Sequence, residues 1–143
     1  MGYDIYSLRE DREVAVKHAK KYGSLWLNDD GEYDYKAPST LYFRLNIWGM
    51  PILREFHSAI GFDEVNENLM DNSGNIIKDY ECRELSEAIA ALDDEAVEVK
   101  MREVLDAHQF YSANPTSEQL GEAAKEWVST IREWQEFLAH CSD

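Results

Sequence analysis

The most regular hydrophobic pattern lies in the last quarter of the chain. Apolar residues recur there at alternating spacings of four and three, at Leu120, Ala124, Trp127, Ile131, Trp134, Leu138 and Cys141. This spacing is typical of a helix with one apolar stripe, and Thr116 and Gln119 have the spacing of a capping box at its start. We therefore expect a long amphipathic helix over residues 116–141. Its stripe packs either into the chain's own core or against a copy in a homodimer, and the short length of the seam favours the core.

Helical spacing of apolar residues recurs in four earlier segments. A short helix is expected after Asp11, because lysines gather toward its end and Gly23 follows them, as the helix dipole and a glycine C-cap favour. A second helix is expected to begin near Pro51, since proline is tolerated in the first turn of a helix but not further in. Two more are expected over 82–92 and 93–108, where apolar residues repeat every three or four positions.

Alternating aromatic and branched residues predict strands in the first third of the chain. The segments 3–8 and 40–45 have this pattern, and 24–28 is expected to form a shorter strand. The polar residues 71–75 are expected to form a loop. The order of elements predicts one domain over 1–143 of the α+β class, in which three to four helices and the long C-terminal helix pack on a small antiparallel sheet.

The densest group of polar and aromatic residues is the stretch YFRLNIWGMP at 42–51, where the second strand meets the helix at Pro51. Arg44 offers a planar fork of donors suited to carboxylate or phosphate, and Asn46 offers a donor and an acceptor. Trp48 and Tyr42 offer flat faces for stacking. These four are the candidate ligand-binding residues. A structural alternative stays open, in which Asn46 caps the turn, Arg44 pairs with a nearby acid and Trp48 is buried.

The charge of the chain narrows its classes of partner. It has 29 acidic and 14 basic residues, and its formal net charge is −15. Nucleic-acid binding requires clustered Lys and Arg, and anionic membranes repel acidic surfaces, so we expect neither direct nucleic-acid binding nor membrane binding. Such a charge either keeps a protein soluble or complements a host protein with a basic surface.

The sequence has no motif for a metal, a cofactor or a nucleophile. Gly31 and Gly74 do not fit a calcium loop, because the first ligand position would be Trp26 or Leu69, and the four histidines are too scattered for a zinc site. Cys82 lies on an apolar helical stripe, which is expected to bury its thiol and raise its pKa. We therefore predict no catalytic residue, no metal and no cofactor. Because the two cysteines are too few for a disulfide framework and no signal peptide is visible, we expect a cytoplasmic location in a bacterial host cell.

Several segments together resemble a known group of proteins. They are GYDIY at 2–6, YFRLNIWGMPIL at 42–53, NSGNII at 72–77, ECRELSEAIAAL at 81–92 and WVSTIREWQEFLAHC at 127–141. In this order they are similar to a widespread family of small bacterial and bacteriophage proteins with a Gly-x-Asp-x-Tyr start and a Tyr-Phe-Arg-x-Asn-x-Trp box. The resemblance implies no activity, but it implies that Arg44, Asn46 and Trp48 form a shared constellation for ligand or partner contact. Many members continue into a Gly-Gly-Phe segment after the last helix, which this sequence lacks.

Two hypotheses of function follow. The first is a non-catalytic binding protein, encoded by a phage or mobile element, that acts in counter-defence. It either sequesters an anionic, nucleotide-like small molecule held by Arg44 and stacked on Trp48, or acts as an inhibitor that blocks a host defence factor. The alternative is a small enzyme acting on an anionic substrate clamped by Arg44, with His57 or a carboxylate as general base. The enzyme requires a titratable group beside Arg44.

Overall fold

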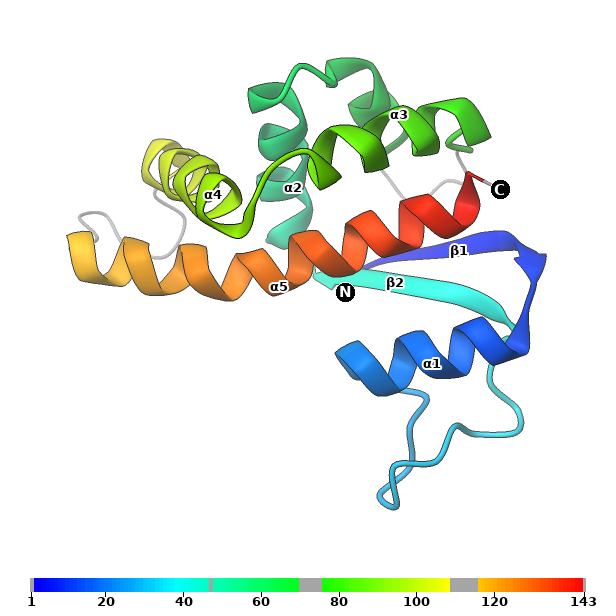
Figure 1. Cartoon of the computed structure of the whole chain (residues 1–143). Coiled ribbons are helices and arrows are strands. Elements are labelled where there is room, and N and C mark those ends of the chain that lie inside the picture. Colours follow the sequence, from blue (N-terminus) through cyan, green and yellow to red (C-terminus); the bar gives the residue numbers. More distant parts are fainter. Residues whose placement is uncertain (1, 47, 70–75, 109–115, 143) are drawn as a thin grey trace.

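The structure, a computed structural model, describes residues 2–46, 48–69, 76–108 and 116–142 (Figure 1). Its elements follow in the order β1 (Gly2–Glu10), α1 (Arg12–Tyr22), β2 (Thr40–Asn46), α2 (Gly49–Ala59), the 3-10 helix η1 (Asp63–Leu69), α3 (Asp79–Ala90), α4 (Asp94–His108) and α5 (Ser117–Cys141). The predicted α+β fold, with a small antiparallel sheet and a long C-terminal helix, is confirmed. The loop predicted at 71–75 lies outside the described residues.

The two strands form an antiparallel sheet whose faces differ in character. Ile5 lies opposite Phe43, and Asp4 lies opposite Arg44. Because side chains alternate along a strand, Ile5 and Phe43 share one face, here called the inner face. Asp4, Tyr42 and Arg44 share the other, here called the outer face. The inner face packs on α5, whereas α1 lies on the outer side of the sheet (Figure 1).

The ends of α1 are those that the sequence predicts. Oδ1 of Asp11 accepts a hydrogen bond from the backbone N–H of Val14 at 3.2 Å. At the other end, Gly23 has a φ of 85° and its N–H donates to the carbonyl of Ala19 at 2.8 Å. Glycine enters this backbone region without the steric penalty of a Cβ. The chain therefore leaves the helix here and enters the loop 23–39, which leads to β2.

The strand predicted at 24–28 is not formed. Leu27 and Tyr33 pair only as an isolated antiparallel bridge. The side-chain oxygen of Asn28 accepts a hydrogen bond from the backbone N–H of Glu32 at 2.9 Å. A side chain that bonds to nearby backbone offers the chain an alternative to a strand ladder, and here it holds a turn instead.

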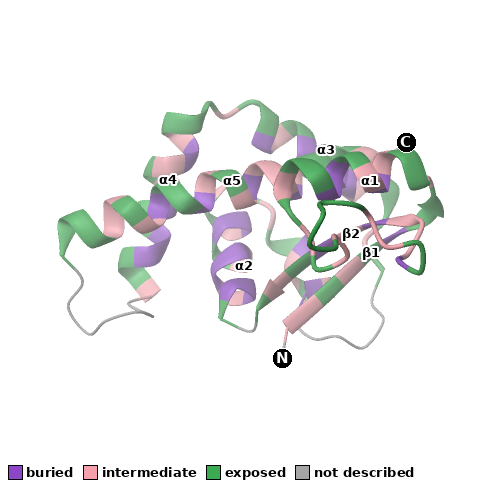
Figure 2. Ribbon diagram, turned by 90° about the horizontal axis from the view of Figure 1, so that it is seen from below, coloured by how far each residue is buried: buried purple, intermediate pink, exposed green. Residues whose placement is uncertain are grey.

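The long helix α5 carries much of the core. Its capping box is present, because the Thr116 hydroxyl accepts from the Gln119 N–H at 3.1 Å and the Gln119 side chain accepts from the Thr116 N–H at 2.9 Å. The stripe is buried at Ala124, Trp127, Ile131, Trp134 and Leu138. Figure 2 shows that α2 is also buried along most of its length. The stripe thus packs inside the chain, and a homodimer through the 116–141 helix, which would need other faces of α5, stays a prediction.

Arg132 of α5 holds the turn between α3 and α4. Nη1 of Arg132 donates to the carbonyl of Ile89 at 3.1 Å, and Nη2 donates to the carbonyl of Leu92 at 2.6 Å. Its Nε pairs with Oδ1 of Asp94 at 2.8 Å. The last carbonyls of a helix have no partner within that helix. Arg132 therefore caps the end of α3 and holds the start of α4 at the same time.

Candidate functional site

The corner between β2 and α2 is held by the side chain of Asn46. Its Oδ1 accepts hydrogen bonds from the backbone N–H groups of Trp48 at 3.1 Å and Gly49 at 2.7 Å. A Cβ at position 49 would lie 3.3 Å from the same oxygen, so glycine lets the carboxamide approach closely. Asn46 therefore caps the start of α2, as the structural alternative for this residue predicted.

Trp48 lies on the surface at the same corner. It is 63% exposed, so the alternative in which this indole is buried is wrong. An exposed indole is available for contact with a ligand or a partner.

Arg44 is only lightly held on the outer face. Its Nε lies 3.7 Å from Oδ1 of Asp4, and the two side chains are 48% and 43% exposed. Exposed ion pairs of this kind contribute about 0 to 1 kcal/mol to stability. Within residues 2–46, 48–69, 76–108 and 116–142, no hydrogen bond engages the terminal nitrogens of Arg44. Arg44 therefore does pair with a nearby acid, Asp4, but most of its N–H donors stay open to an anion.

Tyr42 forms a rigid wall beside Arg44. Its hydroxyl donates a short hydrogen bond to Oδ1 of Asp4. Burial, followed by this hydrogen bond, raises the pKa of Tyr42 above its ordinary value, so the hydroxyl stays protonated at neutral pH. The ring of Tyr6 lies 5.0 Å from that of Tyr42, and the ring of Trp26 lies 6.3 Å away, edge to face. These contacts fix the orientation of the Tyr42 ring.

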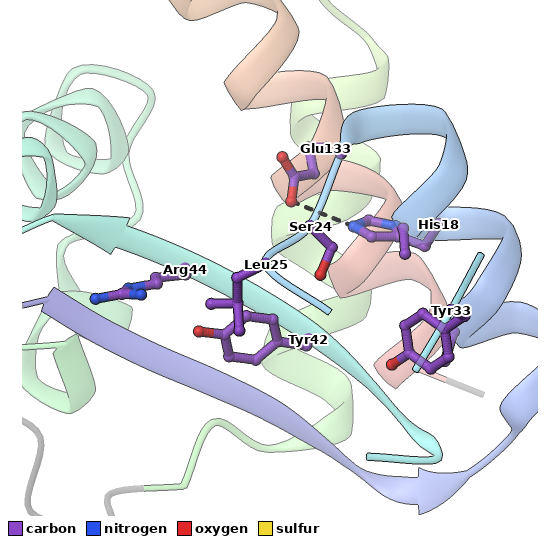
Figure 3. Close-up of a pocket in the computed structure, with 10 residues that line it drawn as sticks. His18, Ser24, Leu25, Tyr33, Tyr42, Arg44 and Glu133 are labelled. Carbon is purple, nitrogen blue, oxygen red and sulfur yellow. Dashed lines mark hydrogen bonds and ion pairs between the residues drawn. The ribbon is translucent and has the colours of Figure 1, made fainter. Parts of the chain in front are cut away.

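A cavity of about 300 Å³ lies over the outer face of the sheet. We call it the Arg44 cavity; it is lined by Ala15, His18, Ala19, Gly23, Ser24, Leu25, Tyr33, Tyr42, Arg44 and Glu133. Figure 3 shows Arg44 at one end, His18 and Glu133 at the other, and Tyr42 and Leu25 between them. The cavity therefore combines aromatic walls and a histidine–carboxylate pair with Arg44 at its end, where the guanidinium is directed away from Tyr42 and Leu25 (Figure 3).

His18 and Glu133 form the polar end of the Arg44 cavity. Nε2 of His18 lies 3.3 Å from Oε2 of Glu133, and their side chains are 7% and 22% exposed. The His18 ring also lies 5.0 Å from the ring of Tyr22. A carboxylate bonded to one ring nitrogen fixes the orientation of an imidazole, which is a common arrangement for proton transfer. A titratable group therefore shares the cavity with Arg44, as the enzyme hypothesis requires.

His57, the histidine proposed as general base, has a structural role instead. It is fully buried, its Nδ1 lies 3.0 Å from Oδ1 of Asn66, and its Nε2 accepts from Nε1 of Trp134 at 2.9 Å. Burial lowers the pKa of His57 to about 4. The ring is therefore neutral at physiological pH, both nitrogens are engaged, and it does not line the Arg44 cavity. The prediction for His57 is wrong.

Cys82 is buried on the apolar stripe of α3, as predicted, with 3% exposure. The prediction of a raised pKa is wrong, because a hydrogen bond from Cys141 lowers the pKa of the Cys82 thiol and outweighs the effect of burial. Among the described residues, no three His, Cys, Asp or Glu side chains are grouped so that they could hold a metal ion. The described helices include none with the length and apolar composition of a membrane span.

Some residues of the Arg44 cavity could be predicted from the sequence, and others could not. Arg44 and Tyr42 line it, whereas Asn46 and Trp48 do not. His18 follows Ala15 by three positions, which places it on the buried face of α1, and this spacing could have identified it. Glu133 is one of 29 acidic residues. No local pattern separates it from the others.

Comparison with protein-family models, curated proteins and solved structures finds no match for this chain. The resemblance to bacterial and bacteriophage proteins therefore stays a prediction. The assignment of a function rests on the chemistry of the site.

Proposed function

We propose that this chain is a non-catalytic binding protein that sequesters a small, nucleotide-like anion in the Arg44 cavity. We further propose that it is encoded by a phage or mobile element and acts in counter-defence, withholding the ligand from a host factor. The observation that carries the binding proposal is the open guanidinium of Arg44 at one end of an aromatic-walled cavity. A planar ligand stacks on Tyr42 while its anionic group binds Arg44.

The size and charge of the cavity restrict the ligand. A volume of about 300 Å³ is at the lower end of small-molecule pockets, so it suits one ring system with its substituent. Among the described residues that line the cavity, Arg44 is the only arginine or lysine, and Asp4 lies beside it. The net charge of −15 further disfavours polyanions. A monoanion or a mononucleotide therefore fits better than a polyphosphate.

Native mass spectrometry of the protein purified from cells is the first test, because it detects a co-purified small molecule directly. Isothermal titration calorimetry with nucleoside 5′-monophosphates is the second. We expect Arg44→Gln to weaken binding by about 10- to 100-fold, the usual effect of losing a hydrogen-bonded charge. Absence of both a co-purified molecule and a calorimetric signal contradicts the proposal.

Trp48→Ala is the matched control for Arg44→Gln. Trp48 belongs to the same corner but does not line the cavity, so its removal should change the affinity by less than about 2-fold. Loss of binding in Trp48→Ala with retention in Arg44→Gln would place the ligand at the corner instead.

The protein-blocking form of the hypothesis has a different signature. A complex between the acidic surface and a basic host protein should dissociate as salt rises from about 50 to 500 mM, because screening weakens interactions between exposed charges. A ligand stacked in the Arg44 cavity should lose much less affinity over this range. Salt-sensitive association with a host protein, without a small ligand, would favour blocking over sequestration.

The second candidate function is a small enzyme acting on an anionic substrate held by Arg44. It is favoured by the His18–Glu133 pair, which places an oriented imidazole in the same cavity. The two functions are separated by the fate of the ligand. Incubation of the co-purified ligand with stoichiometric protein leaves it chemically unchanged if the protein sequesters it. Conversion that is lost in His18→Asn would establish an enzyme.

A further inference from the structure

The two cysteines of the chain lie together at a second, larger cavity. Cys82 is in the first turns of α3 and Cys141 is the last residue of α5, and both are free thiols. The two thiols are close enough that each is the largest influence on the pKa of the other. Both line a cavity of about 800 Å³ that also runs along β1. Two residues far apart in the sequence are thus brought close together at one cavity.

We propose that Cys82 and Cys141 form a redox modification site that is oxidised by hydroperoxides to a reversible intramolecular disulfide. The site is separate from the Arg44 cavity and does not depend on the function proposed for it. The disulfide links the start of α3 to the end of α5, which are two walls of the larger cavity.

The surroundings assign different roles to the two thiols. Cys82 lies near the positive end of the α3 dipole, and a hydrogen bond from Cys141 lowers the pKa of the Cys82 thiol although burial opposes this. The same hydrogen bond and burial raise the pKa of Cys141. Its place at the start of α3 makes Cys82 the thiol that more readily forms the attacking thiolate, and Cys141 is the thiol that resolves the product. Cys82 is only 3% exposed, which admits a small oxidant such as hydrogen peroxide through the cavity but hinders a bulky one.

The reaction needs no group beyond the two thiols and the peroxide. The Cys82 thiolate attacks one peroxide oxygen, so that an S–O bond forms, the O–O bond breaks, and hydroxide leaves and is protonated to water. The sulfur of Cys141 then attacks the sulfenic sulfur of Cys82. An S–S bond forms, the S–O bond breaks, and the departing hydroxide takes the Cys141 proton as water. The two thiols lose two electrons in total, and one peroxide becomes two waters.

The test is peroxide treatment of the full reduced chain, followed by intact mass spectrometry and peptide mapping. We expect a mass loss of two hydrogens, a cross-linked peptide that joins Cys82 to Cys141, and restoration of both thiols by dithiothreitol. The oxidised chain should also melt several degrees higher without reductant, because the disulfide closes a long loop. Retention of both thiols, irreversible oxidation of either one, or a disulfide between two chains would overturn the proposal.

Two variants test the roles of the thiols. In Cys141→Ser, the sulfenic acid of Cys82 should persist and be trapped by dimedone, because the resolving thiol is absent. In Cys82→Ala, Cys141 should stay reduced at the same peroxide dose. Cys82 is buried, so circular dichroism must show that this variant is folded. Even if this variant is unfolded, the peptide map of the wild type still tests the proposal. Equal oxidation of Cys141 with and without Cys82 would contradict the assigned order of attack.

Discussion

The two faces of the small sheet differ both in the residues that they carry and in the elements that cover them. On the inner face, the ring of Phe43 lies 4.8 Å from that of Trp134, and both side chains are almost completely buried. On the outer face, Tyr42 and Arg44 border a cavity. The inner face is sealed by the large apolar side chains of α5. Each face carries an aromatic ring from β2, so the strand and the element that covers it together decide whether that ring becomes core or lines a cavity.

The covering of the outer face explains why a cavity is present there. α1 presents Ala15 and Ala19 toward the cavity, and both are buried. Side chains of this size leave space that Leu or Phe would fill in a close-packed interior. Another part of the wall comes from the loop 23–39, which contains a turn and an isolated bridge.

Two histidines show the same contrast between core and site. His57 belongs to the inner side, where neutral partners, Asn66 and Trp134, engage both ring nitrogens. His18 belongs to the outer side, where it faces Glu133 and lines a cavity. Burial alone does not distinguish them, since both are buried. The two histidines are distinguished by their hydrogen-bond partners and by access to a cavity.

The largest expected effect is the loss of the inner-face tryptophan. Trp134 is 0% exposed, stacks on Phe137 at 5.7 Å and donates to His57. We expect Trp134→Ala to lower the free energy of unfolding by about 3 to 5 kcal/mol, because it leaves a large cavity and an unpaired histidine. Urea denaturation measures this. Trp48→Ala, at a 63% exposed position, is the control and should change stability by less than about 0.5 kcal/mol.

The next effect concerns the pH dependence that His57 imposes. Its pKa is lowered from 6.5 to about 4 in the folded chain, so between these values the unfolded chain binds the proton more readily. The contribution of His57 to stability is full above pH 6.5 and is lost as pH falls toward about 4, by about 3 kcal/mol in total. Urea denaturation of wild type and His57→Gln across this range should show that the wild type loses this extra amount. Parallel pH profiles would contradict a neutral buried His57.

The smallest effects separate two residues of the same corner. Asn46→Ala removes the cap of α2 and should cost about 1 kcal/mol of stability. Arg44→Gln removes an exposed ion pair and should cost less than about 0.5 kcal/mol. Urea denaturation of the two variants, extrapolated to zero urea, gives the two losses of stability and resolves this order. A reversed order, with Arg44 the more important for stability, would mean that Arg44 is a structural residue and not part of a site.

Most elements of the fold could be predicted because their signals are local. The caps at Asp11, Gly23 and Thr116 and the stripe of α5 lie within a few residues of the helices that they define. The prediction of a strand at 24–28 was wrong because another local signal competed with it. Its composition suits a strand, but the Asn28 turn competes with the ladder.

The candidate site could be predicted only in part, because it is assembled over a long distance. Arg44 and Tyr42 are two positions apart on one strand, so alternation places them on one face. His18 and Glu133 are separated by 115 positions. Their meeting depends on how α1 packs against α5, and no periodicity in the sequence encodes that packing.

Arg132 links the order of synthesis to the order of folding. In the turn between α3 and α4, the carbonyl of Ile89 already accepts from the N–H of Leu92, whereas the carbonyl of Leu92 accepts from Arg132, which arrives about 40 positions later on α5. A nascent chain that ends before α5 therefore contains α3 and α4 without Arg132, which contacts both. We expect this pair to consolidate only when the last helix leaves the ribosome, so the C-terminal segment determines when the helical half becomes native.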